Sequence, residues 1–422
     1  MKKIFKNQDF PLYIIFLFFG IDLSTYFALW GIPVVAIKIG VCLLAIYFMF
    51  RYRIFATGCG FKKLSIWYVL IAYMMMLFLR LLVDFVIPWK GFFLYTSPIT
   101  ILLFFFVTML VPMFFFGNKG MKIDTMKWSV IMGVFLCICM AVSFRNNMMG
   151  LAAVSLNGQH QGEGTVDIIS YGHYGCTLIL MGLYIYLEGI KKSRLWLCAL
   201  FVLVGFSAVV LSGSRGPVVA LVLCGILLFA SRTKRTYTIV LFAILFFVLV
   251  SLLSTFIYQF NDFLESRGIV SFSRIIESTI LYSGSGTLDS SGREDIYNMG
   301  WRLFSENMLA GTSLLLPDGS YVHNIFIEQF MALGIFGGSI FIILNIALLK
   351  YCWAIFKKDP KNSLFPALFI QYMVFGLFSR TIIALIPYWL FMFVTLNIYS
   401  GYKKTSYDLS YNSNIQRSRR LA

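Results

Sequence analysis

Long apolar segments follow one another along almost the whole chain. A segment of roughly 17 to 25 apolar residues can cross about 30 Å of hydrocarbon as a helix, which satisfies all its backbone polar groups internally. A composition that is 59% hydrophobic and 13% charged is unlike that of a soluble protein. The sequence therefore predicts an all-α polytopic membrane protein with about 12 transmembrane helices. These fall at about residues 10–29, 32–50, 64–84, 98–116, 128–144, 171–190, 195–211, 217–231, 237–257, 325–349, 364–379 and 382–400.

The net charge of +17 follows the order of the predicted spans. If the N-terminus is cytoplasmic, 25 of the 35 lysines and arginines fall in cytoplasmic connections or termini, and nine fall on the outer side. This distribution obeys the positive-inside rule, so the charge does not indicate a nucleic-acid partner. We predict a multi-pass protein of the cytoplasmic membrane with both termini inside.

The outer connections differ greatly in length, which divides the chain into four parts. Residues 1–257 hold the first nine spans, 258–324 form an outer loop of about 67 residues, 325–400 hold the last three spans, and 401–422 form a basic cytoplasmic tail. A smaller polar outer loop covers 145–170. Because loops as long as 258–324 are usually functional or disordered, we expect the chemistry of the protein to lie there.

The long loop contains a helical signal of its own, SSGREDIYNMGWRLFSEN at 290–307. Ser291 and Glu294 have the spacing of a capping box, and acidic residues crowd the first turn. Apolar residues then recur at helical spacing, at Ile296, Met299, Leu303 and Phe304. We predict a short helix over 292–306 along the outer membrane surface. The alternative is an amphipathic helix that only covers the bundle.

The stretch LSGSRGPVVAL at 211–221 places a permanent positive charge in the tight outer turn between the seventh and eighth predicted spans. The positive-inside rule disfavours an arginine there. Serines and glycines leave backbone N–H groups available, and a guanidinium cannot lose its charge, so the turn around Arg215 resembles an anion site. The alternative is that Arg215 is a snorkelling anchor at the interface.

Further polar residues fall on the outer side: Arg293, Arg302, Arg380, His160, His173 and His323. Arginines with a histidine and carboxylates, opening from the membrane, suit a lipid-linked phosphate or diphosphate. The sequence has no D-x-D pair and no H-x-x-x-H or H-E-x-x-H motif, so we expect neither a metal nor a cofactor. The eight cysteines offer no outer-loop pair, so we expect no disulfide framework.

Three stretches in order resemble one bacterial family: LSGSRGPVVAL, SGREDIYNMGWRLFSENMLAG, and GSYVHNIFIEQFMALGIFGG at 319–338. Over about residues 205–345 the chain resembles the O-antigen polymerase and O-antigen ligase superfamily, particularly its Wzy-type polymerases. In that family a turn of the form S-x-S-R-G precedes a large periplasmic loop, which ends in an H-N motif with an acid or amide nearby. One departure is Met308, where many relatives have proline.

The resemblance implies a metal-independent glycosyltransferase of lipopolysaccharide biosynthesis in the bacterial inner membrane. It would polymerise undecaprenyl-diphosphate-linked oligosaccharide repeat units into O-antigen or a related surface polysaccharide on the periplasmic side. The lipid-linked oligosaccharide would serve as both donor and acceptor. The lipid bilayer is its other partner. The resemblance also leaves a chain-length regulator protein open as a partner.

The resemblance also implies roles for individual residues. Arg215 and Arg293 would hold the leaving diphosphate and stabilise its growing charge. His323 would accept the proton of the attacking hydroxyl as general base, the alternative being a histidine at the start of the tenth span. The further candidates for substrate binding are Arg302, Arg380 and Glu328.

Two other functions remain open on the sequence. An O-antigen ligase would use the same donor but transfer the glycan to lipid A-core. A lipid-linked oligosaccharide flippase would also have about twelve spans, but with short loops and two similar halves. The long loop falls late in this chain and its halves show no repeat, which disfavours the flippase. The overall texture of the sequence favours the polymerase over the ligase.

Overall fold

The computed structural model describes residues 39, 40, 43, 47, 66–86, 105–110, 112, 113, 123–157, 168–189, 195–212, 214–232 and 293–401. These residues form helices and short turns, with no strand among them. The helices are α4 (Ile66–Val86), the short η2 (Phe106–Leu110), α8 (Thr125–Asn157), α9 (Ile168–Leu187), α10 (Leu195–Ser212), α11 (Arg215–Arg232), α14 (Arg293–Glu306), α15 (Ile325–Lys358), the short η5 (Pro360–Asn362) and α16 (Leu364–Phe378). A last helix covers 386–401.

The all-helical prediction is confirmed for the described residues, but the count of twelve spans is not. The predicted spans at 10–29 and 237–257 lie outside the described residues, as does almost all of the tail at 401–422. The first part of the long loop, 258–292, lies outside them too.

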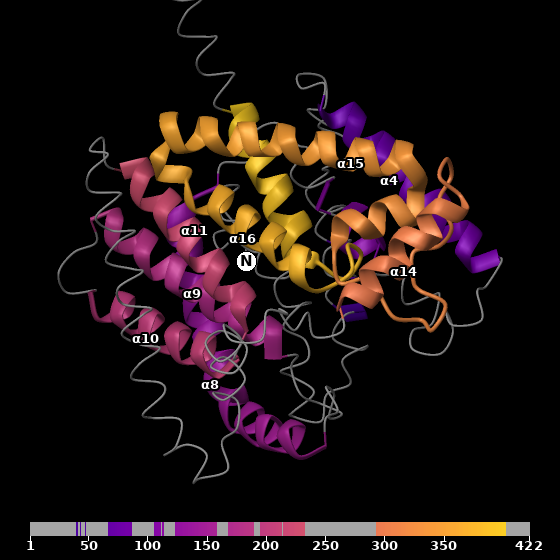
Figure 1. Cartoon of the computed structure of the whole chain (residues 1–422). Helices are drawn as coiled ribbons and strands as arrows, with labels where there is room; N and C mark the ends of the chain where they lie inside the picture. The colour runs from indigo at the N-terminus through magenta and orange to yellow at the C-terminus, as the bar shows by residue number, and fades with distance from the viewer. Residues whose placement is uncertain are drawn as a thin grey trace, which may run out of the picture.

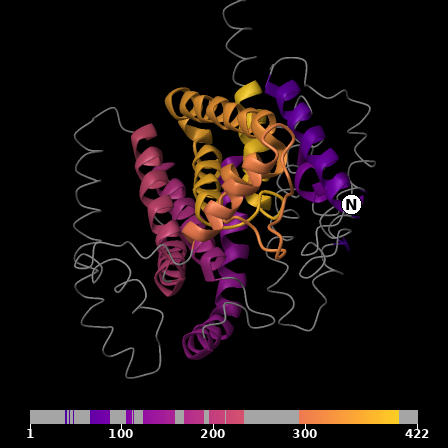
Figure 2. The ribbon, with the colours of Figure 1, turned by 45° about the vertical axis from the view of Figure 1, so that its right-hand side comes forward.

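The helices form two groups that α16 joins (Figure 1). In one group α9 packs against α8, α10 and α11. In the other group α15 packs against α4 and α14. Figure 2 shows α4 on one side of the molecule and α10 and α11 on the other, with the yellow helices between them. Since α16 contacts α9, α11 and α15, it lies between the two groups and packs against both.

Two glycines allow α9 and α10 to approach closely. A Cβ atom added to Gly175 would lie 2.5 Å from the carbonyl oxygen of Gly205, and one added to Gly205 would lie 2.5 Å from that of Gly175. Membrane helices commonly pack through such small residues, because lipid provides no hydrophobic force to bring helices together.

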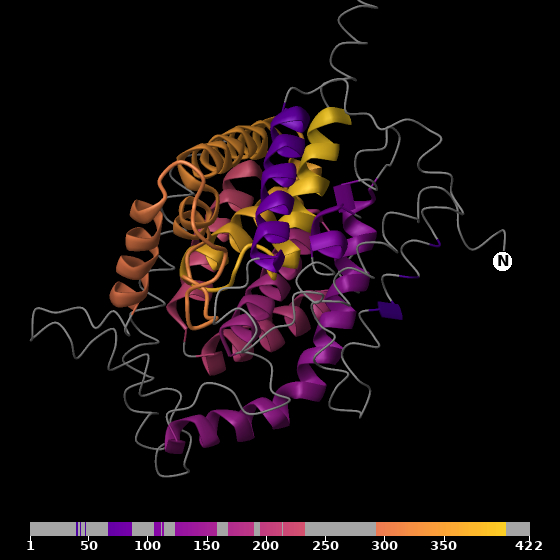
Figure 3. The same ribbon diagram turned by 90° about the vertical axis from the view of Figure 1, so that its right-hand side faces the viewer.

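Aromatic side chains join α4 to the last helix, and Figure 3 shows these two helices side by side. The ring of Trp67 stacks on Phe393 at 6.1 Å, and that of Tyr73 stacks on Trp389 at 6.1 Å. The Tyr73 hydroxyl donates to Oε1 of Gln329 in α15 at 2.7 Å. The polar atoms of this buried contact therefore have partners, as burial away from water requires.

Two of the described helices have the length and apolar composition of membrane helices. Both α4 and α15 are long and apolar enough to cross a bilayer, and shorter apolar helices cover Thr125–Ala141, Leu195–Val209, Gly216–Arg232 and Leu364–Phe378. Large apolar side chains are exposed on α4 and α10, among them Tyr68, Met75, Leu79, Trp196, Leu203 and Phe206. Apolar surface of this extent is suited to contact with lipid.

The helix α15 is broken at Gly334, whose φ of 66° and ψ of −165° interrupt the helical backbone. The segment after α14 fills the break. Ile335 N–H donates to the Met308 carbonyl at 2.7 Å, and Thr312 N–H donates to the Met331 carbonyl at 2.7 Å. Non-helical backbone inside a membrane protein is tolerated where protein satisfies its polar groups in this way.

The break falls within the predicted span at 325–349, and the span itself stays a prediction. A Cβ on Gly334 or on Gly311 would lie 2.2 Å or 2.3 Å from a backbone oxygen of the opposing segment, so both glycines are needed for the approach. Both have positive φ. The unbroken part of the helix is 335–358, which at 1.5 Å per residue is about 36 Å long and sufficient to cross a bilayer.

Two other predicted segments can be compared directly. The helix predicted at 292–306 is present as α14, Arg293–Glu306, although its place at a membrane surface stays a prediction. The helix at the span predicted at 128–144 is longer than that span, since α8 continues to Asn157 through residues predicted as the loop 145–170. This continuation contains Met, Leu and Ala, which favour helix. Figure 3 shows the last part of α8 turning away from the bundle.

Candidate functional site

The candidate site lies at the end of the bundle where α9, α11 and α15 begin and where α10 and α16 finish. At α9, a Cβ on Gly172 would lie 2.4 Å from Ser212 Oγ and 2.8 Å from Pro217. At α16, a Cβ on Gly376 would lie 2.7 Å from Ile325. These contacts bring the turn between α10 and α11 and the start of α15 to the same end of the molecule.

Arg215 is the first residue of α11, so the predicted anion turn leads directly into a helix N-terminus. Ser212 Oγ donates to the Val209 carbonyl at 2.7 Å and accepts from Ser214 N–H at 3.3 Å, which shapes the turn. The side chain of Arg215 lies outside the described part of the structure. The first N–H groups of a helix have no partner within the helix and carry partial positive charge, so this turn favours an anion.

His173 lies in α9 beside that turn and is fully buried. Its ring stacks on Phe375 of α16, with centroids 4.0 Å apart and planes at 22°. Its Nε2 atom would be 3.4 Å from a Cβ added to Gly216, the second residue of α11. Within the described ranges, neither ring nitrogen of His173 has a hydrogen-bond partner.

Arg380 follows α16 and reaches back to α9. Its Nη2 and Nε atoms donate to Ser170 Oγ at 2.5 Å and 3.2 Å, and its guanidinium carbon lies 5.8 Å from the centre of the Phe375 ring. Arg380 and His173 therefore contact the same aromatic ring. The backbone φ of Arg380 is 74°, which is strained for a residue other than glycine.

Glu328, in the first turn of α15, is fully buried and bonded to the residues after Arg380. Its Oε1 atom accepts hydrogen bonds from Thr381 Oγ1 at 2.9 Å and from Ile382 N–H at 3.1 Å. The structure thus brings Glu328 and Arg380 together through this turn. The prediction that Glu328 itself binds substrate stays a prediction.

His323 immediately precedes the cap of α15. Its φ is 60°, and its half-buried ring lies 4.2 Å from the ring of Tyr321. The next residue, Asn324, is the N-cap, because its side chain accepts from Phe326 N–H at 2.9 Å and Ile327 N–H at 3.2 Å. Among the described residues other than glycine, only His323 and Arg380 have positive φ, and both are predicted site residues. Strain of this kind concentrates at functional sites.

The two arginines of α14 lie on different faces of that helix. Gly300 faces α15, since a Cβ there would lie 3.0 Å from Ile327 and 3.1 Å from Val322. Arg293, seven residues earlier, lies on the same stripe as Gly300, whereas Arg302 is exposed and about 200° away around the helix. Arg302 therefore points away from α15.

Helix α14 runs in the same direction as the start of α15. Gly300 lies against Val322 and Ile327, and one turn later the ring of Phe304 lies 5.6 Å from that of Phe330. Because the contacts advance together along both helices, Arg293 at the start of α14 lies toward the end where α15 begins. This is the end that carries His323.

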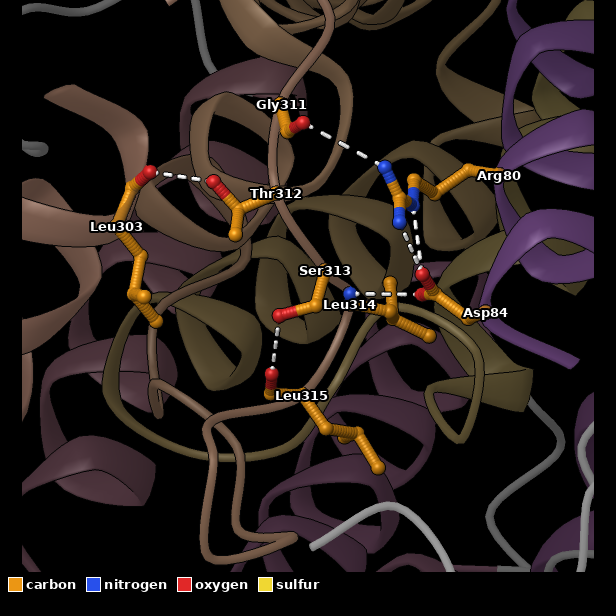
Figure 4. Close-up of polar contacts among 8 residues, drawn as sticks. All are labelled: Arg80, Asp84, Leu303, Gly311, Thr312, Ser313, Leu314 and Leu315. Carbon is orange, nitrogen blue, oxygen red and sulfur yellow. Dashed lines mark hydrogen bonds and ion pairs between the residues drawn. The ribbon is translucent and has the colours of Figure 1, made fainter. Parts of the chain in front are cut away.

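Sequence reasoning missed an ion pair that anchors the end of the long loop (Figure 4). Arg80 and Asp84, one turn apart in α4, pair through Nε at 2.8 Å and also through Nη2. Asp84 Oδ2 accepts from Leu314 N–H at 3.0 Å, and Arg80 Nη1 lies 3.5 Å from the Gly311 carbonyl. The pair thus fixes the segment that fills the break in α15. A charged i,i+4 pair inside an apolar segment is the sequence signal for it.

A second polar cluster fixes the opposite end of the bundle, which sequence analysis assigns to the cytoplasm. Arg232, at the end of α11, pairs with Glu188 and donates to the Pro360 carbonyl at 2.6 Å. The Tyr184 hydroxyl donates to the Lys361 carbonyl at 2.5 Å. These ends of α9 and α11 are therefore held by polar contacts with the segment between α15 and α16.

The described residues contain no group of three or more His, Cys, Asp or Glu side chains that could hold a metal ion. Their chemistry is that of cations and helix N-termini around one end of the bundle, with histidines beside them. Such an arrangement can bind a phosphate or diphosphate and can accept or donate a proton next to it.

Comparison with known protein families gives a match in this region. Residues 199–342 match the family described as O-antigen ligase. The match runs from α10 into α15 and therefore includes Arg215, Arg293 and His323. It agrees with the resemblance found over about 205–345. Comparison of the chain with curated proteins gave no match.

Proposed function

We propose that the chain is a polymerase of lipid-linked glycans, a proposal supported by its match over residues 199–342 to the family described as O-antigen ligase. In this proposal it is a membrane glycosyltransferase that joins undecaprenyl-diphosphate-linked repeat units into O-antigen or a related surface polysaccharide. Its site lies on the periplasmic side of the inner membrane. Both the family and the apolar helices indicate a membrane protein, and family members are glycosyltransferase-like enzymes.

The observation that carries the proposal is the position of three residues relative to helix starts. Arg215 begins α11, Arg293 begins α14, and His323 stands two residues before α15 begins. The starts of α11 and α15 lie at the same end of the bundle, and the start of α14 lies toward that end. Helix N-termini and guanidinium groups both favour anions, and a lipid diphosphate is the anion that a glycan donor in a membrane carries.

The reaction requires the roles that these residues can supply. The acceptor hydroxyl oxygen forms a bond to the anomeric carbon of the donor glycan, while the bond from that carbon to the diphosphate oxygen breaks. The electron pair leaves with the lipid diphosphate, whose growing charge Arg215 and Arg293 stabilise. His323 accepts the proton that the acceptor hydroxyl loses.

The alternative with a specific observation in its favour is the O-antigen ligase, because the matching family carries that description. A ligase would use the same diphosphate site and the same bond changes. It would differ only in its acceptor, which is lipid A-core in place of a second lipid-linked unit. The residues that bind the donor therefore do not discriminate between the two functions.

Deletion of the gene discriminates between them through the surface polysaccharide that remains. If the protein is the polymerase, the strain should carry one repeat unit on the lipid core. Bare core with long glycan accumulating on undecaprenyl diphosphate would instead identify a ligase. Bare core with single units accumulating on that lipid would identify a flippase. An unchanged polysaccharide ladder would contradict all three, and a plasmid copy of the wild-type gene is the control.

A further inference from the structure

We propose that His173 is a binding residue for the phosphate groups of the lipid-linked donor, donating a hydrogen bond from Nε2 to an anion held at the first turn of α11. The inference rests on the proposed function, because it assumes a donor that carries a diphosphate. It adds to that function a histidine on α9 that acts on the leaving group, separate from His323 before α15.

The first observation is that His173 lacks partners where it should have them. The side chain is fully buried, and within the described part of the chain neither Nδ1 nor Nε2 forms a hydrogen bond. A neutral imidazole has one donor and one acceptor, and leaving buried polar atoms without partners costs stability. An anion that accepts a hydrogen bond from Nε2 would give that atom the partner it lacks.

The second observation is the surface that His173 Nε2 faces. That atom would lie 3.4 Å from a Cβ on Gly216, so the imidazole lies beside the first turn of α11 with no side chain of Gly216 between them. Pro217 follows, and its missing N–H is one that the start of a helix could not bond anyway. An anion at this turn would therefore meet free N–H groups and the imidazole together.

The third observation is that Phe375 fixes the plane of the His173 ring and that the guanidinium of Arg380 lies near the same Phe375 ring. Phe375 stacks on the imidazole at 4.0 Å, which holds its plane. The guanidinium of Arg380 lies 5.8 Å from the centre of the same Phe375 ring and bonds Ser170, one helical turn before His173. The start of α11 and the Arg380 guanidinium thus both lie near the imidazole, and all three groups favour a phosphate group.

The test measures binding of an undecaprenyl diphosphate to the purified full-length protein in lipid nanodiscs, by the ligand's shift of the unfolding temperature. Undecaprenol without phosphate and inorganic pyrophosphate are the comparison ligands. The key variant is His173→Phe, which keeps the stack on Phe375 but has no donor. His173→Gln keeps a donor. Tyr171→Phe is the matched control, because it removes a buried polar group from the same turn of α9 on the face toward Met140.

We expect His173→Phe to weaken binding of the lipid diphosphate about 10- to 100-fold, the effect of losing one hydrogen bond to a charged group. His173→Gln should retain most of the binding, and Tyr171→Phe all of it. The ligand-free His173→Phe protein should unfold at the same temperature as wild type or higher, since it no longer buries polar atoms without partners. If His173 is a core residue with no contact to the ligand, His173→Phe should bind the lipid diphosphate as tightly as wild type does. That result would overturn the inference.

The comparison ligands separate this inference from the proposed function. If the wild type binds undecaprenyl diphosphate no better than undecaprenol, the proposed donor is wrong. If Arg215→Ala loses binding while His173→Phe keeps it, the proposed function stands and the role of His173 is wrong. If pyrophosphate alone binds as tightly as the lipid diphosphate and His173→Phe weakens both equally, the site binds the phosphate groups as inferred, without contribution from the lipid.

Discussion

Glu328 holds in place the turn from which Arg380 extends. Its carboxylate accepts hydrogen bonds from Thr381 and Ile382, the two residues after Arg380, although it lies in a different helix and 53 residues from Thr381. Arg380 in turn reaches α9 through Ser170. The acid near the H-N motif therefore has a positioning role that its place in the sequence did not reveal.

The first prediction concerns the Glu328 carboxylate, which accepts the hydrogen bonds from Thr381 and Ile382. Glu328→Gln keeps an oxygen for Thr381 and Ile382, so it should retain polysaccharide ladders and unfold at nearly the wild-type temperature. Glu328→Ala leaves both donors buried without a partner and should cost about 1–3 kcal/mol of stability. Thermal unfolding and ladders beside immunoblots measure both effects. Normal abundance with no ladder in Glu328→Gln would instead assign the charge of Glu328 to the reaction.

The second prediction uses the left-handed backbone of Arg380, whose φ is 74°. Glycine adopts this conformation without strain, and alanine does not. Arg380→Gly should therefore be more stable than Arg380→Ala by about 1 kcal/mol, although both lose the contact with Ser170. If Arg380 binds substrate, both variants should lose ladders equally. Unfolding temperatures and immunoblots measure stability, and full ladders from the glycine variant would contradict a role in binding.

Local patterns were sufficient to predict most of the described helices. The apolar run at 364–379 corresponds to α16, Leu364–Phe378, and the capping signal at 292–306 corresponds to α14, Arg293–Glu306. These features depend on neighbours within a few residues, which a sequence displays directly. The same is true of the turn before α11, whose serines and glycines identified Arg215 as a candidate.

Features that depend on distant segments could not be predicted. The break at Gly334 is stable because Met308 and Thr312 form hydrogen bonds with the backbone on either side of it. No residue pattern near Gly334 in the sequence predicts these bonds. Arg380 bonds Ser170 across 210 residues of chain, and that contact brings it to the ring on which His173 stacks. His173 was placed on the outer side by topology alone, so its position beside α11 required the fold.

The third prediction distinguishes the catalytic role of the His323 side chain from the requirement for its left-handed backbone conformation. Asparagine tolerates a φ of 60° better than most residues, so His323→Asn should fold normally while lacking a general base. Its turnover should fall by about 10²- to 10⁴-fold, with donor binding nearly unchanged. Initial rates with purified protein measure turnover, and the shift of the unfolding temperature by undecaprenyl diphosphate measures donor binding. Asn324→Ala is the control, because loss of the cap should cost about 1 kcal/mol of stability without removing the base.

The fourth prediction concerns the ion pair of α4, in which Asp84 is 1% exposed and Arg80 13%. Asp84→Ala leaves Arg80 uncompensated and Leu314 N–H without an acceptor, so it should cost about 3–5 kcal/mol. The double variant Arg80→Met with Asp84→Asn keeps an acceptor for Leu314 and removes both charges. It should recover most of the lost stability.

Thermal unfolding in detergent measures these variants. Asp318→Asn is the matched control, since it removes an acidic charge from an exposed turn of the same loop and should have little effect. If the double variant is no more stable than Asp84→Ala, the two residues are not coupled. The segment that fills the break in α15 would then be held by its backbone bonds alone.

The fifth prediction concerns Arg215 at the start of α11. If its guanidinium binds the leaving diphosphate, Arg215→Ala should reduce polymer formation at least about 100-fold at normal protein levels. Arg215→Lys should recover little, because an ammonium keeps the charge but loses the two-pronged hydrogen bond. An arginine that only anchors the turn at the interface predicts that lysine replaces it well, since lysine snorkels equally. The matched control is Arg232→Lys at the other end of α11, where an ammonium can still pair with Glu188. Ladders from a complemented deletion strain, read beside immunoblots, decide between the two roles: full-length ladders from Arg215→Lys would assign this arginine to anchoring.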